Sequence, residues 1–265
     1  MTTHFVDVDD GRIRYRLDGA TDAPVLVMSN SLGTDLSMWE PQMAELTRVF
    51  RVLRYDTRGH GESSITQGPY SIERLGRDVV ALLDRLAIDR VHFCGLSLGG
   101  MTGMWLATHA PIRVRRLALC NTAARIAPAD LWNTRIDQVR AGGMEAIVDA
   151  VLARWFTPRF LAESSVVAEA VRPMFLACPA DGYIACCAAV RDMDQREAIT
   201  GINAPTLVMA GTYDAATPPA DGRFIADRIA GARYVELTSA HLSNIEAAHH
   251  FTEALMSFFG TERAG

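Results

Sequence analysis

The chain has 265 residues, a formal net charge of −5 and a pI of about 5.8, and 49% of its residues are hydrophobic. This acidic balance argues against a nucleic-acid partner, because such partners favour a basic face on the protein. The length suits one large domain or a core with an inserted subdomain, and no apolar run approaches the roughly 18 residues that a membrane span needs.

The amino-terminal segment and the cysteines indicate the compartment. The segment from Met1 to Phe5 has neither the basic nor the apolar stretch of a signal peptide. The five cysteines are odd in number and lack metal-like spacing, so we expect reduced thiols. We therefore predict a cytoplasmic protein with no metal site and no membrane association, whose oligomeric state the sequence leaves open.

The first half of the chain alternates predicted strands and helices. Alternating residues on both sides of the turn at Asp9-Asp10-Gly11 predict a β-hairpin. Short apolar runs predict strands buried on both faces, and apolar residues at helical spacing predict helices. In chain order, these are strands at 25–28 and 49–55, a helix at 71–86, a strand at 91–94, a helix at 101–109 and a strand at 116–120.

The pattern changes between residues 122 and 196, where no strand is predicted. Four helices are expected there, at 131–141, 144–155, 158–171 and 182–193, separated by Pro and Gly. The alternation then returns with a strand at 206–210, a helix at 220–229, a strand at 233–237 and a helix at 245–259. We predict an α/β fold with a mostly parallel central sheet and helices on both faces, a core of residues 1–121 and 197–265, and an inserted all-helical cap at 122–196.

A candidate nucleophile lies in the segment Gly95-Leu96-Ser97-Leu98-Gly99. The Gly-x-Ser-x-Gly pattern is weak alone, but here it follows a predicted strand and opens a predicted helix, as in the nucleophile elbow of α/β hydrolases. A strained turn would project the Ser97 hydroxyl above the sheet, and the two glycines would let neighbouring backbone pass close by. We predict that Ser97 is a catalytic nucleophile.

A serine nucleophile needs a base and an acid, which follow it in the order acid, then histidine, in this fold. His241 comes just after the last predicted strand and is the candidate base; Asp214 comes after the strand at 206–210 and is the candidate acid. Some relatives of the fold carry the acid after the strand that ends at Cys120, but Asn121 occupies that position here and cannot be the acid.

The oxyanion hole should use two backbone N–H groups. One belongs to Leu98, the residue after the nucleophile. We expect the other from Leu32, in the loop after the strand at 25–28. The segment from Arg54 to Ser63 resembles loops that are mostly structural in this fold, so we expect hydrogen bonds from Asp56 and Arg58 to hold the turn rather than to take part in chemistry.

Several segments of the chain together resemble the 3-oxoadipate enol-lactonases, bacterial α/β-hydrolases of aromatic catabolism. The resemblance spans nearly the whole chain and includes a stretch with paired cysteines in the predicted cap. The segments are 29–34 with Trp39, 54–63, 68–73, 92–101, 181–183 with Cys186 and Cys187, 191–194, and 240–246.

The resemblance implies hydrolysis of 3-oxoadipate enol-lactone to 3-oxoadipate, in the β-ketoadipate pathway, through an acyl-enzyme and without a cofactor. The substrate bears a carboxylate, which needs a charge partner or convergent donors. Arginines in the predicted cap are candidates for this role, of which Arg191 lies in a family-like segment, and Trp132 and Trp155 could wall a small pocket. The other candidate arginines are Arg125, Arg135, Arg140, Arg154, Arg159 and Arg172.

Other functions share these residues. A cofactor-free carboxylesterase or perhydrolase of the same fold would keep Ser97, Asp214 and His241 and differ only in its pocket, and so would a carbon–carbon bond hydrolase. A non-enzymatic receptor could keep the fold, but it would not need all three residues. Dehalogenases and typical epoxide hydrolases of this fold use an aspartate nucleophile, so Ser97 argues against both.

Overall fold

A single sheet of eight strands runs through the structure, a computed structural model that describes residues 3–260. The strand order is β1-β2-β4-β3-β5-β6-β7-β8, and all neighbours from β4 to β8 are parallel. The pairs β1–β2 and β2–β4 are antiparallel. The strands are β1 (His4–Val8), β2 (Gly11–Asp18), β3 (Val25–Ser29), β4 (Arg51–Tyr55), β5 (Val91–Leu96), β6 (Val114–Cys120), β7 (Thr206–Gly211) and β8 (Arg233–Leu237).

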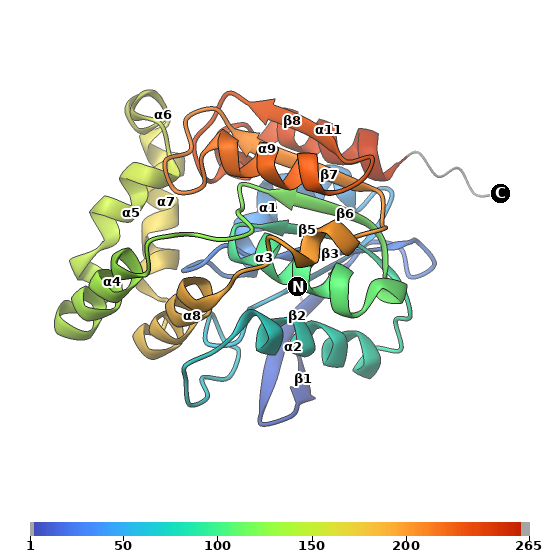
Figure 1. The fold of residues 1–265 in the computed structure, drawn as a ribbon, viewed down its shortest axis with the longest axis horizontal. Coiled ribbons are helices and arrows are strands. Elements are labelled where there is room, and N and C mark those ends of the chain that lie inside the picture. The colour runs from blue at the N-terminus through green and yellow to red at the C-terminus, as the bar shows by residue number, and fades with distance from the viewer. Residues whose placement is uncertain (1–2, 261–265) are drawn as a thin grey trace.

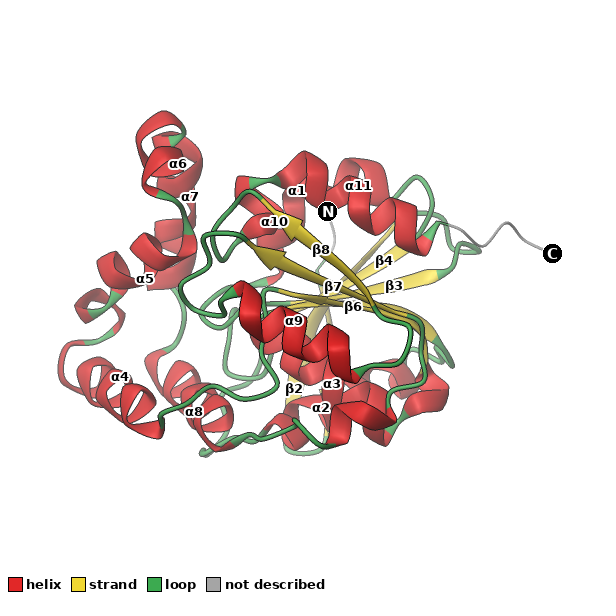
Figure 2. Ribbon diagram, turned by 45° about the horizontal axis from the view of Figure 1, so that its top comes forward, coloured by secondary structure: helices red, strands yellow, loops and turns green. Residues whose placement is uncertain are grey.

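The middle of the sheet is buried on both faces, which explains its continuous apolar strands. Every residue of β5 and β7 is buried. Figure 2 shows α1 (Glu40–Leu46) and α11 (Ala248–Phe259) on one face and α2 (Ile72–Arg85), α3 (Leu98–His109) and α9 (Pro219–Arg228) on the opposite face. The predicted parallel sheet with helices on both faces is therefore confirmed.

Five helices separate β6 from β7 in the chain. They are α4 (Ala129–Gly142), α5 (Val148–Trp155), α6 (Pro158–Glu163), α7 (Ser165–Leu176) and α8 (Ala180–Asp192). α4 packs against α8, and α5 packs against α7. Both views place this group to one side of the sheet, and in Figure 2 the arrowheads of β7 and β8 point toward it. The carboxyl ends of the parallel strands therefore face this helical segment.

Some predicted boundaries were wrong. The helix expected at 158–171 is two helices, because Ser164 has a non-helical backbone (φ −128°, ψ 38°). The helix expected at 245–259 is also two, α10 (Ser243–Glu246) and α11, separated at Ala247. The sequence patterns gave no prediction of α1, a short helix with Pro near its start.

The cysteines and the helix lengths bear on the expected thiol state and on the search for membrane spans. All five cysteines are buried and free. Among residues 3–260, no single helix is long and apolar enough to cross a membrane, and one bent pair, α7 with α8, reaches the necessary length and composition.

Candidate active site

Ser97 occupies a sharp turn between β5 and α3. Its φ of +56° lies in the left-handed region that residues other than glycine seldom adopt. The turn fits only because its neighbours are glycines. A Cβ on Gly95 would overlap the Gly99 carbonyl, and a Cβ on Gly99 would overlap the Ser29 carbonyl. The strand, strained serine and helix together have the geometry of a nucleophile elbow.

Asp214 and His241 are joined by a hydrogen bond. Asp214 follows β7, His241 follows β8, and each is 3% exposed. The distance from His241 Nδ1 to Asp214 Oδ2 is 2.8 Å. Because a carboxylate only accepts hydrogen bonds, Nδ1 carries the proton and Nε2 is left as the basic nitrogen.

Asp214 is surrounded by donors. Its Oδ1 accepts the backbone N–H groups of Ala216 and Thr217, and its Oδ2 also accepts the Thr217 hydroxyl and the Asn121 amide. Burial alone would raise the pKa of Asp214, but the charge of His241 and these hydrogen bonds outweigh burial and hold the pKa below its ordinary value. The carboxylate is therefore kept ionised beside the imidazole.

Thr217 has a role that the sequence analysis missed. Its hydroxyl lies 2.9 Å from Asp214 Oδ2 and 3.4 Å from His241 Nδ1. The spacing in the sequence could have indicated this contact, because a threonine three residues after an aspartate is well placed to donate a hydrogen bond to it in a local turn.

The two predicted oxyanion donors, Leu98 and Leu32, line the same cavity as the nucleophile. Leu98 is the first residue of α3, so its N–H has no acceptor within the helix and lies at the positive end of the helix dipole. In the loop after β3, Ser31 N–H contacts Met38 Sδ, Gly33 N–H bonds His60 and Thr34 N–H bonds the Ser31 carbonyl. Leu98 and Leu32 both line the same cavity as Ser97 and His241.

Asn30 ties the loop after β3 to the elbow and to β4. Its carbonyl accepts Gly99 N–H, its side-chain oxygen accepts the Trp39 indole N–H, and its side-chain amide donates to the Tyr55 carbonyl. These three bonds fix the loop that carries Leu32.

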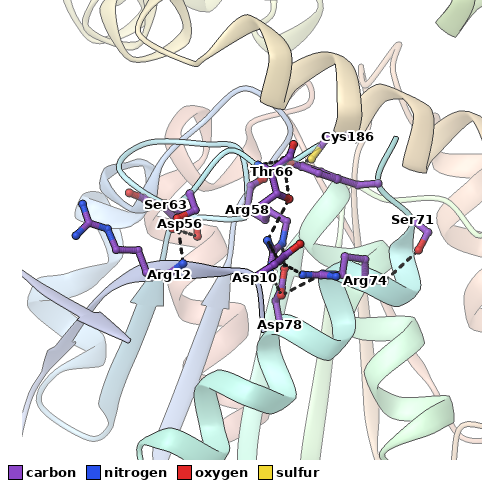
Figure 3. Close-up of polar contacts among 12 residues, drawn as sticks. Asp10, Arg12, Asp56, Arg58, Ser63, Thr66, Ser71, Arg74, Asp78 and Cys186 are labelled. Carbon is purple, nitrogen blue, oxygen red and sulfur yellow. Dashed lines mark hydrogen bonds and ion pairs between the residues drawn. The ribbon is translucent and has the colours of Figure 1, made fainter. Parts of the chain in front are cut away.

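The loop at residues 54–63 is held by buried ionic contacts (Figure 3). The Arg58 guanidinium donates to both oxygens of Asp78, at 2.7 Å and 2.5 Å, and to Asp10 at 2.8 Å. Asp56 accepts the backbone N–H groups of Leu36 and Glu62. None of these residues lines the cavity that contains Ser97.

The cavity at Ser97 has a volume of about 440 Å³. The sheet side contributes the reactive groups, and the helical segment contributes apolar walls and two arginines. The helical residues that line it include Trp132 and Arg135 on α4, Arg154 and Trp155 on α5, and Tyr183 and Val190 on α8.

Arg191, predicted to touch substrate, does not line this cavity. Its guanidinium pairs with Asp192 at 2.7 Å and 2.8 Å and donates to the Asn133 side chain at 3.0 Å. Its neighbour Val190 lines the cavity. Successive side chains on an α-helix are rotated by about 100° around its axis, so Arg191 points in a different direction from Val190. The arginines that do line the cavity are Arg135 and Arg154.

Within residues 3–260, no three His, Cys, Asp or Glu side chains are grouped so that they could hold a metal ion.

The sequence profile described as "alpha/beta hydrolase fold" matches residues 24–166. The 3-oxoadipate enol-lactonase 2 of Acinetobacter baylyi is 42% identical over 97% of this chain and 98% of that protein. The 3-oxoadipate enol-lactonase 1 of the same organism is 38% identical over 93% of this chain and 92% of that protein. The crystal structure of the enol-lactonase from Burkholderia xenovorans has a TM-score of 0.95 and 49% identity, and covers 97% of this chain and 100% of that chain.

Proposed function

The chain belongs to the α/β-hydrolase fold family and is an ester or lactone hydrolase, and on that premise we propose that it hydrolyses 3-oxoadipate enol-lactone to 3-oxoadipate. One observation carries the proposal: a single cavity is lined by Ser97, by His241 and by two arginines suited to a carboxylate. The names of the relatives above are the basis for the identity of the lactone. We further propose that the reaction belongs to the β-ketoadipate pathway of aromatic catabolism, as the sequence resemblance implies.

In the proposed first step, the Ser97 hydroxyl attacks the ring carbonyl carbon of the lactone. His241 Nε2 takes the serine proton, and Asp214 holds the imidazole in the correct tautomer and stabilises the imidazolium that forms. The 2.8 Å hydrogen bond between Asp214 and His241 supports these roles.

The carbonyl oxygen becomes negatively charged as the tetrahedral intermediate forms. We propose that the N–H groups of Leu98 and Leu32 donate to it. Each such donor contributes about 3 kcal/mol to the stabilisation of the transition state. Their shared place with Ser97 in the lining of one cavity supports this assignment.

Collapse of the intermediate breaks the bond between the acyl carbon and the ring oxygen. The enol oxygen leaves and takes a proton from the His241 imidazolium, while it stays tethered within the acyl-enzyme. Water, deprotonated by His241, then attacks the acyl carbon and releases Ser97 with its proton restored. Conversion of the released enol to the ketone gives 3-oxoadipate and pulls the reaction forward.

We propose that Arg135 and Arg154 bind the carboxylate arm of the substrate. Arg135 stands on α4 three residues after Trp132, and its guanidinium carbon lies 5.0 Å from the centre of the Trp132 ring. Stacking of this kind holds a guanidinium in one orientation while it keeps its N–H groups free to donate. Arg154 adds a second positive charge to the same cavity.

We also propose that residues 122–196 act as a cap over the site. Its helices supply Trp132, Trp155 and Val190 to the cavity walls, whereas the core residues 1–121 and 197–265 supply the reacting groups. In this arrangement the core determines the reaction and the cap determines the substrate.

The experiment compares kcat/KM for the enol-lactone with kcat/KM for short p-nitrophenyl esters, in the wild type and in Arg135→Gln, Arg154→Gln and Arg191→Gln. We expect the first two variants to raise KM for the lactone about tenfold, since a lost charge-assisted hydrogen bond costs about 1.5–3 kcal/mol, and to leave the neutral esters unaffected. Arg191→Gln is the matched control and should behave as wild type.

A strong preference for the neutral esters in the wild type would contradict the lactonase proposal and favour a carboxylesterase. Peracid formation or cleavage of a carbon–carbon bond at a higher rate than lactone hydrolysis would favour the other two alternatives. A KM effect in Arg191→Gln alone would overturn the assignment of the carboxylate site.

A further inference from the structure

Asn121 is a buried amide at the end of β6, next to the proposed acid. Its backbone has a φ of +44°, in the left-handed region where asparagine is enriched among residues other than glycine. The strand order places β6 beside β7, so the residue after β6 and the loop after β7 meet at the same edge of the sheet. Asn121 therefore belongs to the same edge as Asp214.

The contacts of the Asn121 side chain determine how its amide is oriented. Its nitrogen lies 3.1 Å from Asp214 Oδ2 and 3.2 Å from the Ala240 carbonyl, and its oxygen accepts the Ser243 hydroxyl at 2.5 Å. A carboxylate and a carbonyl can only accept, so the group that faces them must be the NH₂. The amide thus donates to the acid and to the residue that precedes His241.

We propose that Asn121 is a positioning residue for the catalytic pair, which holds Asp214 Oδ2 in line with His241 Nδ1. This inference rests on the proposed roles of Asp214 and His241. Asp214 Oδ2 accepts from His241, Thr217 and Asn121, and the donors come from three different segments of the chain. Because the Asn121 amide also bonds the Ala240 carbonyl, one side chain fixes both the acid and the segment that carries the base.

A neutral donor is needed at this position. A carboxylate there would place a second negative charge against Asp214, and two carboxylates in contact cannot both ionise without mutual repulsion. The other titratable groups whose charges act on Asp214 are His241 and, on α9, Asp221. The Asn121 amide donates a hydrogen bond to the carboxylate and adds no charge.

The test compares Asn121→Asp with Asn121→Gly. Both residues tolerate a positive φ, so the backbone turn is kept in each variant. Asp retains the shape and the acceptor for Ser243 but replaces the donor by a negative charge, whereas Gly removes the side chain. The matched control is Asn203→Asp, which makes the same charge change at an exposed position before β7, at the opposite end of that strand from Asp214.

For Asn121→Asp we expect the acidic limb of the kcat/KM profile to move up by about one pH unit, because added negative charge favours protonated His241. For Asn121→Gly we expect kcat to fall about tenfold with KM within twofold of wild type, since loss of orientation affects the transition state more than binding. Asn203→Asp should change neither quantity.

Ser243→Ala is a second, smaller change that keeps Asn121 and removes the hydroxyl that holds its oxygen. We expect kcat to fall about threefold with the melting temperature preserved. A wild-type pH profile in Asn121→Asp, together with wild-type kcat in Asn121→Gly and in Ser243→Ala, overturns the inference.

Labelling of the wild type at Ser97 by a fluorophosphonate separates this inference from the proposed function. If Ser97 is labelled and the Asn121 variants behave as wild type, only the positioning role is contradicted. If Ser97 is not labelled, the hydrolase mechanism itself fails, and the positioning role fails with it.

Discussion

His60 Nε2 accepts a hydrogen bond from the backbone N–H of Gly33, at 2.9 Å. Gly33 follows Leu32, so this bond supports the loop that carries the second proposed oxyanion donor. The bond requires an unprotonated Nε2, because a protonated imidazole can only donate. His60 is fully buried beneath the loop, and its charge state is therefore coupled to the shape of the site.

The stability of the fold should depend on pH through His60. Burial lowers the pKa of His60 from 6.5 to about 4. In the unfolded chain His60 binds its proton at a higher pH than in the folded chain. The contribution of neutral His60 to the free energy of unfolding is therefore fully present above about pH 6.5 and is lost as the pH falls toward 4. The difference in pKa corresponds to about 3 kcal/mol over this window.

The measurement is the free energy of unfolding at several pH values for the wild type, His60→Leu and the exposed control His250→Leu. We expect His60→Leu to be less stable near pH 7 and to show a weaker pH dependence between 4 and 6.5. Parallel curves for the wild type and His60→Leu would show that another group is responsible.

Replacing Ser97 should separate activity from backbone strain. Both Ser97→Ala and Ser97→Gly remove the nucleophile, so we expect each to abolish turnover. Glycine adopts a φ of +56° without penalty, whereas alanine keeps the strain, so Ser97→Gly should be about 1 kcal/mol more stable than Ser97→Ala. Chemical denaturation of the two variants measures this, and equal stabilities would mean that the turn is not strained.

The small residues of the elbow should be intolerant of a methyl group. A Cβ on Gly99 would collide with the Ser29 backbone, which belongs to the neighbouring strand. We expect Gly99→Ala to cost about 3 kcal/mol or to prevent folding. Gly201→Ala is the control, since a Cβ there meets no atom within 4 Å. Comparable melting temperatures for the two variants would be inconsistent with this packing.

The buried pair Arg58–Asp78 should be far more important for stability than an exposed pair. Its two side chains are 1% and 5% exposed, and removing Asp78 leaves the buried Arg58 guanidinium with only the exposed carboxylate of Asp10 as its ionic partner (Figure 3). We expect Asp78→Ala to cost about 3–5 kcal/mol. Asp137→Ala breaks the exposed contact between Asp137 and Arg140 and should cost well under 1 kcal/mol. Urea unfolding of both variants compares them, and similar losses would contradict a structural role for Arg58.

The sequence predicted the fold class because the relevant signals are local. Buried parallel strands are continuous apolar runs, and the Gly-x-Ser-x-Gly segment lies between a strand and a helix in the chain itself. The order of Ser97, Asp214 and His241 follows from strand positions alone. The hydrogen bond between Asp214 and His241 then shows that the two predicted residues meet.

The sequence did not predict which arginines of the cap face the cavity, although Trp132 and Trp155, expected as possible pocket walls, both line it. Val190 and Arg191 are neighbours in the chain, yet only Val190 lines the cavity, because the outcome depends on how α8 is rotated against α4. Asn121 was considered only as a position that cannot supply the acid. Its contacts with Asp214 and Ser243 join residues 93 and 122 positions apart, which no local pattern reveals.

Ser97 is proposed to open the enol-lactone through an acyl-enzyme, and rapid-quench mass spectrometry of the wild type during turnover of 3-oxoadipate enol-lactone tests this step. Because the leaving oxygen stays tethered, the acyl-enzyme should weigh more than the free protein by the full mass of the lactone, with the adduct on the peptide that contains Ser97. Ser97→Ala should show neither adduct nor turnover. Turnover of the lactone by Ser97→Ala at the wild-type rate, or an adduct on a different residue, would contradict the account.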